Sequence, residues 1–265
     1  MDRKIDIDEL KKIQLSMLEY VDEFCRRNNI DYWITSGTLL GAVRHKGYIP
    51  WDDDIDIGMK RVDYEKFMVL FNKVESPYIF KCYEIDNTYQ YQMGKILDTR
   101  TVLYEPNAKS GYEISVYLDL FVYDYIPNDR KTVEHIYKKR DFYKKIRTLQ
   151  SADRHNGSIL RQRLLDIVSM VLKVIPKKYL VKKIVMNGEK YRKVDTGYFG
   201  DYVGDYRLVI DSRILDEFID VEFEGKKFKA PLKFDEWLGL FYGNYMQLPP
   251  EEKRIPHHEF EAYYI

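Results

Sequence analysis

Over the first 60 residues, the spacing of apolar positions changes from a helical to a strand-like period. Between residues 8 and 28, apolar side chains recur every three or four positions, which predicts an amphipathic helix. The aromatic and β-branched segment DYWITS, from residue 31, predicts a short strand, and TLLGAVRH after it predicts one or two helical turns. In DIDIGM, residues 54–59, carboxylates alternate with apolar residues, which predicts a strand with one polar face.

The rest of the chain carries further helix and strand patterns. Residues 61–74 predict a helix, and three aromatic-rich segments predict strands: YIFKCYEI, YQMGKILDT and YEISVYLDLFVYDYIP. From residue 130 to residue 192 the pattern is helical and basic, with a break at Pro176. The remaining predicted elements are a hairpin around Glu224 and Gly225, a short helix over 233–243 and a turn over 248–254.

This order of elements predicts an α+β (α/β) fold, with a mixed sheet and flanking helices. We expect a single domain over residues 1–265, because no repeat, low-complexity tract or long flexible linker interrupts the chain. Residues 130–195 are predicted to form an added helical layer, as an insertion or subdomain of this domain.

Composition narrows the class of protein. The 43 Lys and Arg residues balance the 43 Asp and Glu residues, which argues against a dedicated nucleic-acid-binding protein. Cys25 and Cys82 lie far apart without metal-ligand spacing, so we expect reduced thiols. The polar N-terminus lacks a signal-peptide core, and no run reaches the ~18 apolar residues of a membrane span. We therefore expect a cytoplasmic protein.

Four aspartates gather between positions 52 and 56, a density at which like charges repel unless a cation lies among them. Asp54 and Asp56 are two positions apart, so in a strand both side chains leave one face. Ile55 and Ile57 then point the other way, into the core. Hard carboxylate oxygens suit Mg²⁺ or Mn²⁺. We therefore favour a metal site over a solvated acidic turn.

Two other uses of an acidic cluster fit this sequence less well. A calcium-binding loop requires a glycine where Ile57 stands and a glutamate where Asp63 stands. In nucleotide-sugar glycosyltransferases, a metal-binding Asp-x-Asp pair usually follows a substantial nucleotide-binding half. Here one predicted helix and one predicted strand precede Asp54.

A glycine turn ahead of the acidic strand is suited to binding phosphate. Gly37 lets the backbone approach a ligand closely, and the first turn of the following helix presents free N–H groups and a positive dipole end. Arg44, about two turns further along, carries a guanidinium group that binds phosphate oxygens bidentately. A strand, a glycine turn, a short helix and a strand-borne Asp-x-Asp pair, in this order, resemble the architecture of the nucleotidyltransferase superfamily.

The segment TSGTLLGAVRHKGYIPWDDDIDIGM closely resembles the central motif of the LicD family, whose relatives include the fukutin-related sugar phosphotransferases. The helix before it, YEKF after it, YLDLFVYDYIP and the terminal FYGNYMQLPPEEKRIPHH are also similar to this family. The resemblance therefore reaches both ends of the chain, although the helical middle has no detailed match. It implies a nucleotidyltransferase-like core and a metal-dependent transferase.

The resemblance also implies roles for individual residues. Asp54 and Asp56 are expected to be the paired metal ligands, with Asp52 and Asp53 as supporting or alternative ligands. A third carboxylate is expected from a later strand, and we choose Asp119 because it is flanked by apolar residues on the strongest predicted strand. The phosphate-facing turn and its helix are expected to comprise Gly37, Thr38 and Gly41.

Other polar residues are weaker candidates. Asp124 is the second choice for the third metal ligand, and a turn-capping role is the alternative for Asp119. Lys95 and Arg100 are expected near the same sheet, either to neutralise phosphate or as ordinary surface charges. The terminal pair His257 and His258 resembles a family motif and would bind phosphate or transfer a proton, unless it belongs to an exposed tail.

Members of the family are associated with the transfer of a phospho-alcohol, typically phosphocholine from CDP-choline, to a sugar hydroxyl of a cell-surface glycan or its lipid-linked precursor. The resemblance implies that one or two Mg²⁺ ions bridge the diphosphate and that CMP leaves. Asp53 or Asp119 is expected to assist deprotonation of the acceptor. For a choline group, an aromatic wall would hold the ammonium by cation–π attraction, to which Trp51 is better suited than Trp33, a predicted core residue.

Two alternatives remain open at the level of sequence. One is transfer of phosphoethanolamine, a phosphonate alcohol or a polyol phosphate such as ribitol phosphate on the same scaffold. The other is a non-catalytic module that binds nucleotide or glycan, against which the intact Asp54 and Asp56 pair and the glycine turn argue. The sequence does not distinguish between donors, acceptors, metal numbers or oligomeric states.

The basic segment RQRLLDIVSMVLKVIPKKYLVKKIV, residues 161–185, mixes apolar and basic residues as interfacial helices do. A packed helical layer with a solvated basic face is our favoured interpretation. The alternative is peripheral contact with the inner face of the cell membrane.

Overall fold

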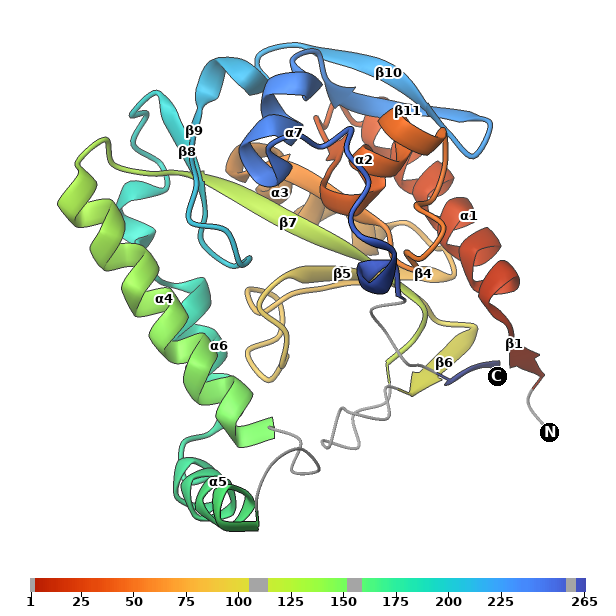
Figure 1. Cartoon of the computed structure of the whole chain (residues 1–265). Coiled ribbons are helices and arrows are strands. Elements are labelled where there is room, and N and C mark those ends of the chain that lie inside the picture. The colour runs from red at the N-terminus through yellow and green to blue at the C-terminus, as the bar shows by residue number, and fades with distance from the viewer. Residues whose placement is uncertain (1–2, 105–113, 152–158, 256–260) are drawn as a thin grey trace.

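A mixed β-sheet forms the centre of the protein. The computed structural model describes residues 3–104, 114–151, 159–255 and 261–265 (Figure 1). The main sheet contains β2 (Trp33–Ile34), β3 (Asp56–Lys60), β4 (Tyr78–Lys81), β5 (Gly94–Asp98), β7 (Tyr117–Tyr125), β8 (Tyr198–Asp201) and β9 (Val209–Asp211). Their order is β2-β3-β7-β5-β4, with β8 beside β7 and β9 beside β8. Parallel and antiparallel strands occur together, and with the flanking helices they confirm the predicted α+β fold.

Strand β7 organises the main sheet because it pairs with three other strands. It runs parallel to β3, with Asp56 beside Asp119, and antiparallel to β5 and β8. Side chains alternate along β7, so Leu118 and Leu120 are buried in the core while Asp119 and Phe121 lie on the opposite face. The register of β3 against β7 therefore decides which acidic side chains meet.

Helices lie around the sheets. Those described are α1 (Ile7–Arg27), α2 (Ser36–His45), α3 (Arg61–Leu70), α4 (Arg130–Ser151), α5 (Ile159–Leu172), α6 (Lys177–Val185) and α7 (Phe234–Tyr242). The amphipathic α1 agrees with the predicted helix and packs beside α3, with the ring centroids of Phe24 and Phe67 5.6 Å apart. The helix predicted over residues 61–74 is shorter than expected and ends in a 3₁₀ turn at Phe71–Lys73.

Two smaller sheets hold distant segments together. One has the order β1 (Lys4–Ile5), β12 (Glu261–Tyr264) and β6 (Thr101–Tyr104), so segments near the two termini pair side by side. The other is the predicted hairpin of β10 (Phe218–Phe223) and β11 (Lys226–Pro231). The patterns do not predict β1, β6, β8, β9 or β12, because such short strands carry too few residues to show a period.

The tip of the predicted hairpin supports the loop that leads to the four aspartates. Glu224 and Gly225 have φ angles of 51° and 72°, as the tight turn requires. The backbone N–H of Tyr48 donates to the Glu224 carboxylate at 3.0 Å. A Cβ atom on Gly47 would lie 2.1 Å from the same carboxylate, so a larger residue there would push the hairpin tip away. Loop and hairpin thus hold each other in place.

The helical segment after β7 positions another loop of the protein. Arg140, on α4, is fully buried and donates to the carbonyl oxygens of Asp201 and Tyr206, both at 2.7 Å. Lys144, one turn further along, donates to the carbonyl oxygen of Gly204 at 2.9 Å. These bonds satisfy backbone carbonyls of the loop after β8, which would otherwise be costly to bury. Helix α4 therefore sets the conformation of residues 201–206.

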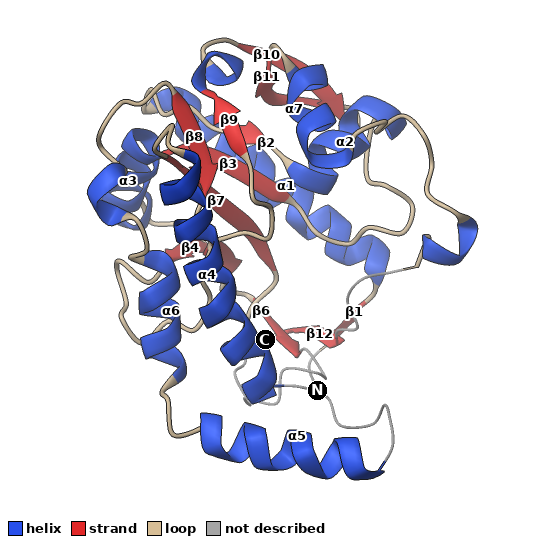
Figure 2. Cartoon of the chain, turned by 60° about the vertical axis from the view of Figure 1, so that its left-hand side comes forward, coloured by secondary structure: helices blue, strands red, loops and turns tan. Residues whose placement is uncertain are grey.

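The prediction of a packed helical layer is correct for part of this segment and wrong for α5. In α6, Leu180, Val181 and Ile184 are buried as expected. In α5, by contrast, Leu164 and Ile167 are 62% and 57% exposed. Figure 2 shows α5 at the end of the molecule away from the main sheet, with α4 and α6 between them. Within the described ranges, no helix is long and apolar enough to cross a membrane.

A buried ion pair joins α3 to β7. Arg61 donates to the two carboxylate oxygens of Asp124 at 2.7 and 2.8 Å, and Arg192 lies 3.4 Å away. Asp124 is fully buried and lies on the face of β7 opposite to Asp119, since five positions separate them. The second choice for the third metal ligand is therefore engaged in the core. Cys25 and Cys82 are free and buried, as expected for reduced thiols.

Replacing Asp124 should destabilise the protein strongly. In Asp124→Asn the buried Arg61 loses its nearest counter-charge and keeps Glu84 at 3.3 Å, and we expect a loss of about 3 kcal/mol in the free energy of unfolding. The exposed pair of Glu23 and Arg27 provides the control, since Glu23→Gln should cost less than about 1 kcal/mol. Urea unfolding of both variants measures the difference, and equal losses would contradict a structural role for Asp124.

Candidate active site

A cavity of about 650 Å³ lies between β3, β7, α2, α7 and the loop after β8. Its lining is rich in two kinds of side chain. The carboxylates that line it are Asp52, Asp54, Asp56, Asp201 and Asp205. The aromatic residues that line it are Trp51, Phe121, Tyr123, Tyr206, Phe241, Tyr242 and Tyr245. The cavity thus combines a strongly acidic wall with an aromatic wall.

Asp56 is the buried centre of the acidic wall. Its backbone N–H donates to the Thr38 hydroxyl at 2.8 Å, and its carbonyl oxygen accepts from the Thr35 N–H at 3.0 Å. Burial raises the pKa of the Asp56 carboxyl well above its ordinary value, and the nearby charges of Asp54, Asp119 and Asp52 raise it further. The fold therefore holds a carboxylate where its own charge is unfavourable unless a cation is bound.

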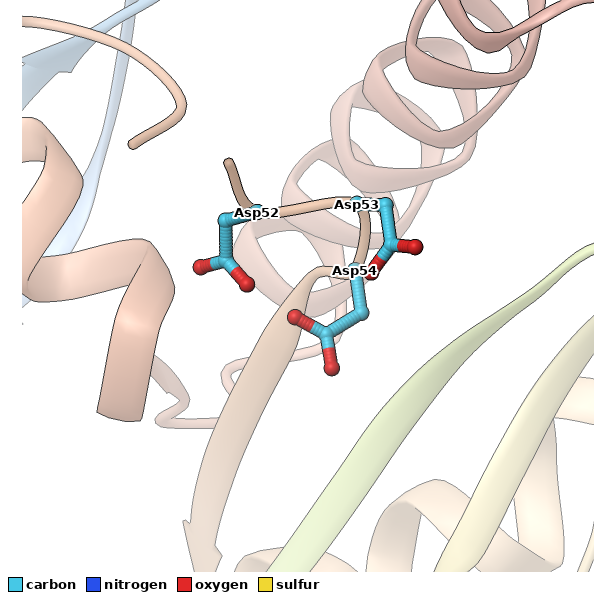
Figure 3. Close-up of side chains that lie close together, drawn as sticks. All are labelled: Asp52, Asp53 and Asp54. Atoms are coloured by element: carbon cyan, nitrogen blue, oxygen red, sulfur yellow. The ribbon is translucent and has the colours of Figure 1, made fainter. Parts of the chain in front are cut away.

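The turn before β3 carries the other three aspartates. Their carboxylate oxygens include a set that lies within 4.8 Å of one another. Figure 3 shows Asp52 and Asp54 directed to one side of the turn and Asp53 to the other. Asp53 is buried, and its carbonyl oxygen accepts from the Gln14 side chain of α1 at 3.1 Å. Of these three aspartates, Asp52 and Asp54 are the ones that line the cavity.

Two sequence expectations about this turn change in detail. Strand β3 begins at Asp56, so Asp54 precedes the strand although it lines the same cavity. Ile55 and Ile57 are fully buried, as the alternating pattern predicted. Asp53 or Asp119 was expected to assist deprotonation of the acceptor, but neither lines the cavity, whereas Asp52 does.

The Asp52 carboxylate lies so close to Gly37 that it occupies the space of a side chain at position 37. A Cβ atom at Gly37 would lie 2.4 Å from a carboxylate oxygen of Asp52, closer than real Cβ atoms approach. Gly37 lies in the first turn of α2, where the N–H groups and the positive dipole end favour a negative charge. The glycine that was expected to admit phosphate therefore admits a carboxylate, while it also lines the cavity.

Thr38 and Gly41 stabilise the structure behind the cavity wall. Thr38 is 2% exposed and its hydroxyl holds the first residue of β3, so its side chain anchors the acidic strand. A Cβ atom on Gly41 would lie 2.4 Å from the carbonyl oxygen of Gly47, so this glycine allows α2 to pack against the following loop. Both residues make contacts within the protein, and neither lines the cavity.

Asp119 lies beside Asp56, as its choice as third carboxylate requires, but a lysine already accompanies it. The Lys95 ammonium lies 2.5 Å from Asp119, and the two residues are cross-strand neighbours on β5 and β7. Lys95 is 3% exposed, and its ammonium lies 3.3 Å from the centre of the Tyr117 ring. Lys95 is therefore a buried partner of the acidic cluster, and the surface-charge alternative is wrong.

Arg44 and Arg100, the two expected phosphate-binding arginines, have different positions. Arg44 lines the cavity and donates to the Tyr245 carbonyl oxygen at 2.9 Å. Burial lowers its pKa, and the neighbouring Arg254 adds to this effect. Arg100 instead lies at the turn between β5 and β6, where it pairs with Asp98 at 2.6 Å. Arg100 follows β5 at the end of the strand away from Lys95 and does not line the cavity, so of the two alternatives an ordinary surface charge agrees with its position.

Trp33 and Trp51 have the different positions that the sequence predicted. Trp33 is fully buried in the core, stacked at 5.9 Å on Phe218, whereas Trp51 lines the cavity. The guanidinium of Arg254 lies 5.7 Å from the centre of the Trp51 ring. His257 and His258 lie outside the described residues.

The structure adds residues that the sequence patterns did not indicate. Ser36 lines the cavity with a left-handed φ of 48°, unusual for a residue other than glycine, and hydrogen-bonds the Asp56 carboxylate. Tyr206, Phe241 and Tyr242 form an aromatic cluster, with ring centroids 4.9 Å apart for Tyr206 and Phe241 and 6.4 Å apart for the two tyrosines. Only the FYGNY segment, quoted above as similar to a family motif, signalled part of this cluster.

The acidic wall has the donor chemistry of a divalent-metal site. Its donors are carboxylate oxygens, which Mg²⁺ and Mn²⁺ prefer. Asp54, Asp56 and Asp119 were expected as ligands, and both Asp54 and Asp119 lie close enough to raise the pKa of Asp56. Asp52 acts on Asp56 in the same way. A bound cation would relieve the repulsion among these four groups, so the residues fit the predicted ion.

Comparisons with known proteins cover the whole chain. Residues 29–154 match the family described as LicD/FKTN/FKRP, nucleotidyltransferase domain. The lipopolysaccharide cholinephosphotransferase LicD of Haemophilus influenzae is 34% identical over 275 aligned positions, which cover 99% of this chain and 100% of that protein. Human ribitol 5-phosphate transferase FKRP is 45% identical over 40 residues, which are 15% of this chain and 8% of that protein.

The matched region includes the parts of the fold that build the acidic wall. It begins before β2 and runs through α2, β3, β5 and β7, which carry Ser36, Asp56, Lys95 and Asp119. The similarity to the Haemophilus protein extends further, over α7 and the aromatic cluster. Full-length similarity at this identity, together with the matched nucleotidyltransferase domain, places the chain in the LicD family.

Proposed function

We propose that this chain is a metal-dependent phosphotransferase that moves phosphocholine from CDP-choline to a sugar hydroxyl of a cell-surface glycan or its lipid-linked precursor. The observation that carries the proposal is the burial of Asp56 in the wall of a large cavity, with Asp52 and Asp54 in the same wall and Asp119 beside Asp56 on β7. The Haemophilus relative, named a lipopolysaccharide cholinephosphotransferase, supports the same reaction.

In this proposal Asp54, Asp56 and Asp119 hold Mg²⁺ or Mn²⁺, with Asp52 beside them. A divalent ion bound there would neutralise the charge of the CDP-choline diphosphate and favour departure of CMP. Lys95 balances the negative charge of Asp119 and orients its carboxylate, since its ammonium lies 2.5 Å away. The Ser36 hydroxyl favours the charged form of Asp56 and so lowers its pKa against the effect of burial.

The other cavity residues position the reactants. Arg44 and the first turn of α2 offer positive charge to the diphosphate. Asp52 faces the cavity, so we assign it the proton of the attacking sugar hydroxyl, in place of Asp53. The hydroxyl oxygen bonds to the phosphorus as the phosphorus–oxygen bond to CMP breaks, and Asp52 keeps the proton. Catalysis then rests on positioning and charge, without a covalent enzyme intermediate.

The aromatic wall suits the choline end of the donor. A quaternary ammonium has no N–H to donate, so it is bound by ring faces and by nearby negative charge rather than by hydrogen bonds. Tyr206, Phe241 and Tyr242 provide such rings in the cavity, and Asp205 lines the same region. A polyol phosphate would instead require several hydrogen-bonding partners for its hydroxyls. This contrast favours choline over ribitol as the transferred alcohol.

Replacing Asp56 should abolish metal-dependent transfer while the protein stays folded. In Asp56→Asn we expect turnover of CDP-choline to fall by at least about a hundredfold, because the cavity loses its buried charged ligand. The exposed Asp8→Asn is the matched control and should keep full activity. Turnover by Asp56→Asn equal to that of the control would contradict the assignment.

Raising the pH should lower the stability of the cation-free protein through Asp56 and should increase the stabilisation that a divalent cation provides. The folded protein holds a proton on Asp56 that the unfolded chain releases, because the Asp56 pKa is raised on folding. Without cations, the contribution of Asp56 to the free energy of unfolding therefore falls as pH rises from the ordinary carboxyl pKa through the raised one. Cation binding displaces that proton, so the rise in Tm caused by Mn²⁺ should be larger at pH 8 than at pH 5.5.

Thermal unfolding of wild type and Asp56→Asn, with and without Mn²⁺, tests this expectation. The variant should be at least as stable as wild type at pH 8 without cations and should show little stabilisation by Mn²⁺. A Mn²⁺-induced rise in Tm that is independent of pH, or equal in the variant, would overturn the predicted role of Asp56.

The choline assignment predicts a selective effect of the aromatic wall. Tyr206→Leu should raise the KM for CDP-choline by roughly fivefold, equivalent to about 1 kcal/mol of cation–π attraction. It should change the KM for CDP-ribitol less. Tyr179→Leu, which alters an exposed tyrosine on α6, is the control. If wild type uses CDP-ribitol or CDP-ethanolamine in preference to CDP-choline, the donor assignment is wrong while the metal site is retained.

A further inference from the structure

Helix α5 presents an apolar stripe to solvent. The stripe consists of Leu164, Ile167, Met170, Val171 and Val174, which are 62%, 57%, 67%, 60% and 83% exposed. Leu164, Ile167, Met170 and Val171 recur every three or four positions within the helix, so they share one face, and Val174 follows just after the helix ends at Leu172. Large apolar side chains gathered on one outward face of a helix are typical of an interaction surface.

The opposite side of α5 is fixed to the body of the protein. The side-chain amide of Gln150, on α4, donates to the carbonyl oxygens of Leu172 and Ile175, both at 2.7 Å. The buried Ser169 hydroxyl donates to the Gln150 carbonyl oxygen at 3.4 Å. These polar contacts at the end of α4 set the rotation of α5 about its axis. The α5 apolar stripe is therefore directed outward by the fold.

Positive charge surrounds the α5 apolar stripe. Residues 162–185 contain six lysines and arginines and one acidic residue, Asp166, although the whole chain has a formal charge of zero. Of the six, Arg163, Lys173, Lys178 and Lys182 are exposed. Five of the 43 acidic residues of the chain line the cavity instead. Residues 162–185 therefore carry a local formal charge of +5, six basic residues against one acidic residue.

We propose that α5 and the start of α6 form a docking surface for an anionic lipid bilayer. An apolar face inserted at the level of the headgroups, with lysines and arginines beside it, is how interfacial helices bind membranes. Long basic side chains extend along such a face and keep their charges at the headgroups. At 14 residues, α5 is too short to span a bilayer, so the contact is peripheral.

The positive charge distinguishes a bilayer from a second copy of this chain. In a two-fold dimer the same surface lies on both subunits, so the basic residues around one stripe would face those around the other. Unlike charges would be needed for a favourable contact, and an anionic lipid surface supplies them. The charge pattern therefore favours lipid over self-association.

The docking surface is connected to the cavity through α4. One end of α4 holds α5 through Gln150, and its buried Arg140 holds the loop at residues 201–206, part of which lines the cavity. Figures 1 and 2 place α5 at the end of the molecule opposite to α2 and α7. If the proposed function is correct, docking would hold the protein at a membrane that carries a lipid-linked acceptor, with α2 and α7 at the end away from the bilayer. Docking itself requires no catalysis.

Vesicle flotation with the full chain tests the proposal. The probe is phosphatidylcholine vesicles containing phosphatidylglycerol, at low salt, with pure phosphatidylcholine vesicles for comparison. We expect wild type to float with the anionic vesicles and to be released by high salt. The triple variant Leu164→Glu, Ile167→Glu and Val171→Glu should bind at least about tenfold less, because each carboxylate opposes insertion into an anionic surface.

Control variants show whether a loss of flotation is specific to the docking surface or follows any similar change of charge. Val62→Glu, Val69→Glu and Val74→Glu change three exposed valines in and just after α3, and this protein should float like wild type. Lys173→Glu, Lys178→Glu and Lys182→Glu should reduce flotation, whereas the same change at exposed Lys12, Lys73 and Lys227 should have a smaller effect. Circular dichroism verifies that each variant is folded.

Two outcomes would overturn the proposal. One is failure of wild type to float with anionic vesicles at low salt, or equal flotation of the α5 variant. The other is a wild-type dimer, seen by light scattering, that dissociates in the α5 variant and does not bind vesicles, which would assign the stripe to self-association. Transferase activity on a water-soluble acceptor is measured separately, so loss of flotation with intact activity identifies a failure of docking rather than of the proposed function.

Discussion

The parallel pairing of β3 with β7 is the constraint on which the site depends. It places Asp56 directly beside Asp119 and brings the turn with Asp52 and Asp54 to the same cavity wall. Burial and mutual repulsion raise the pKa of Asp56, so the fold stores an unfavourable charge arrangement at one place. Thr38 accepts a hydrogen bond from the Asp56 backbone N–H and Lys95 pairs with the Asp119 carboxylate, and these contacts hold both residues in position despite that repulsion. Such a preorganised acidic wall is what a metal-dependent transferase needs.

Elements far from the acidic wall complete the cavity. The hairpin tip at Glu224 supports the loop before the aspartate turn, and Arg140 of α4 holds the loop that contributes Tyr206. Helix α7 adds Phe241 and Tyr242. The helical segment after β7 thus has two effects: its inner residues shape the cavity, and α5 presents an apolar stripe to solvent. A single scaffold thereby links the proposed chemistry to the proposed membrane contact.

The fold was predictable where the pattern was long. The 21-residue α1 and the nine-residue β7 show clear periods, and the hairpin at Glu224 and Gly225 has a recognisable turn. Short strands such as β6 and β12 exist because partners distant in sequence complete their hydrogen bonding, so no local pattern marks them. For helix α5 the pattern was clear, but the burial inferred from it was wrong. Its apolar residues indicated packing, but polar contacts through Gln150 turn them outward.

The sequence by itself determined a local pattern: aspartate alternates with isoleucine after a glycine turn, so Ile55 and Ile57 are buried in the core while Asp54 and Asp56 face the cavity. Spacing along one strand is a local property, and local properties are encoded by neighbouring residues. The tertiary structure alone decided which of these groups face the cavity. It turned Asp53 away, paired Lys95 with Asp119, carried Arg100 to another turn and assembled the aromatic wall from residues 206–245. Those arrangements depend on strand register and on long-range packing, which no short stretch of sequence contains.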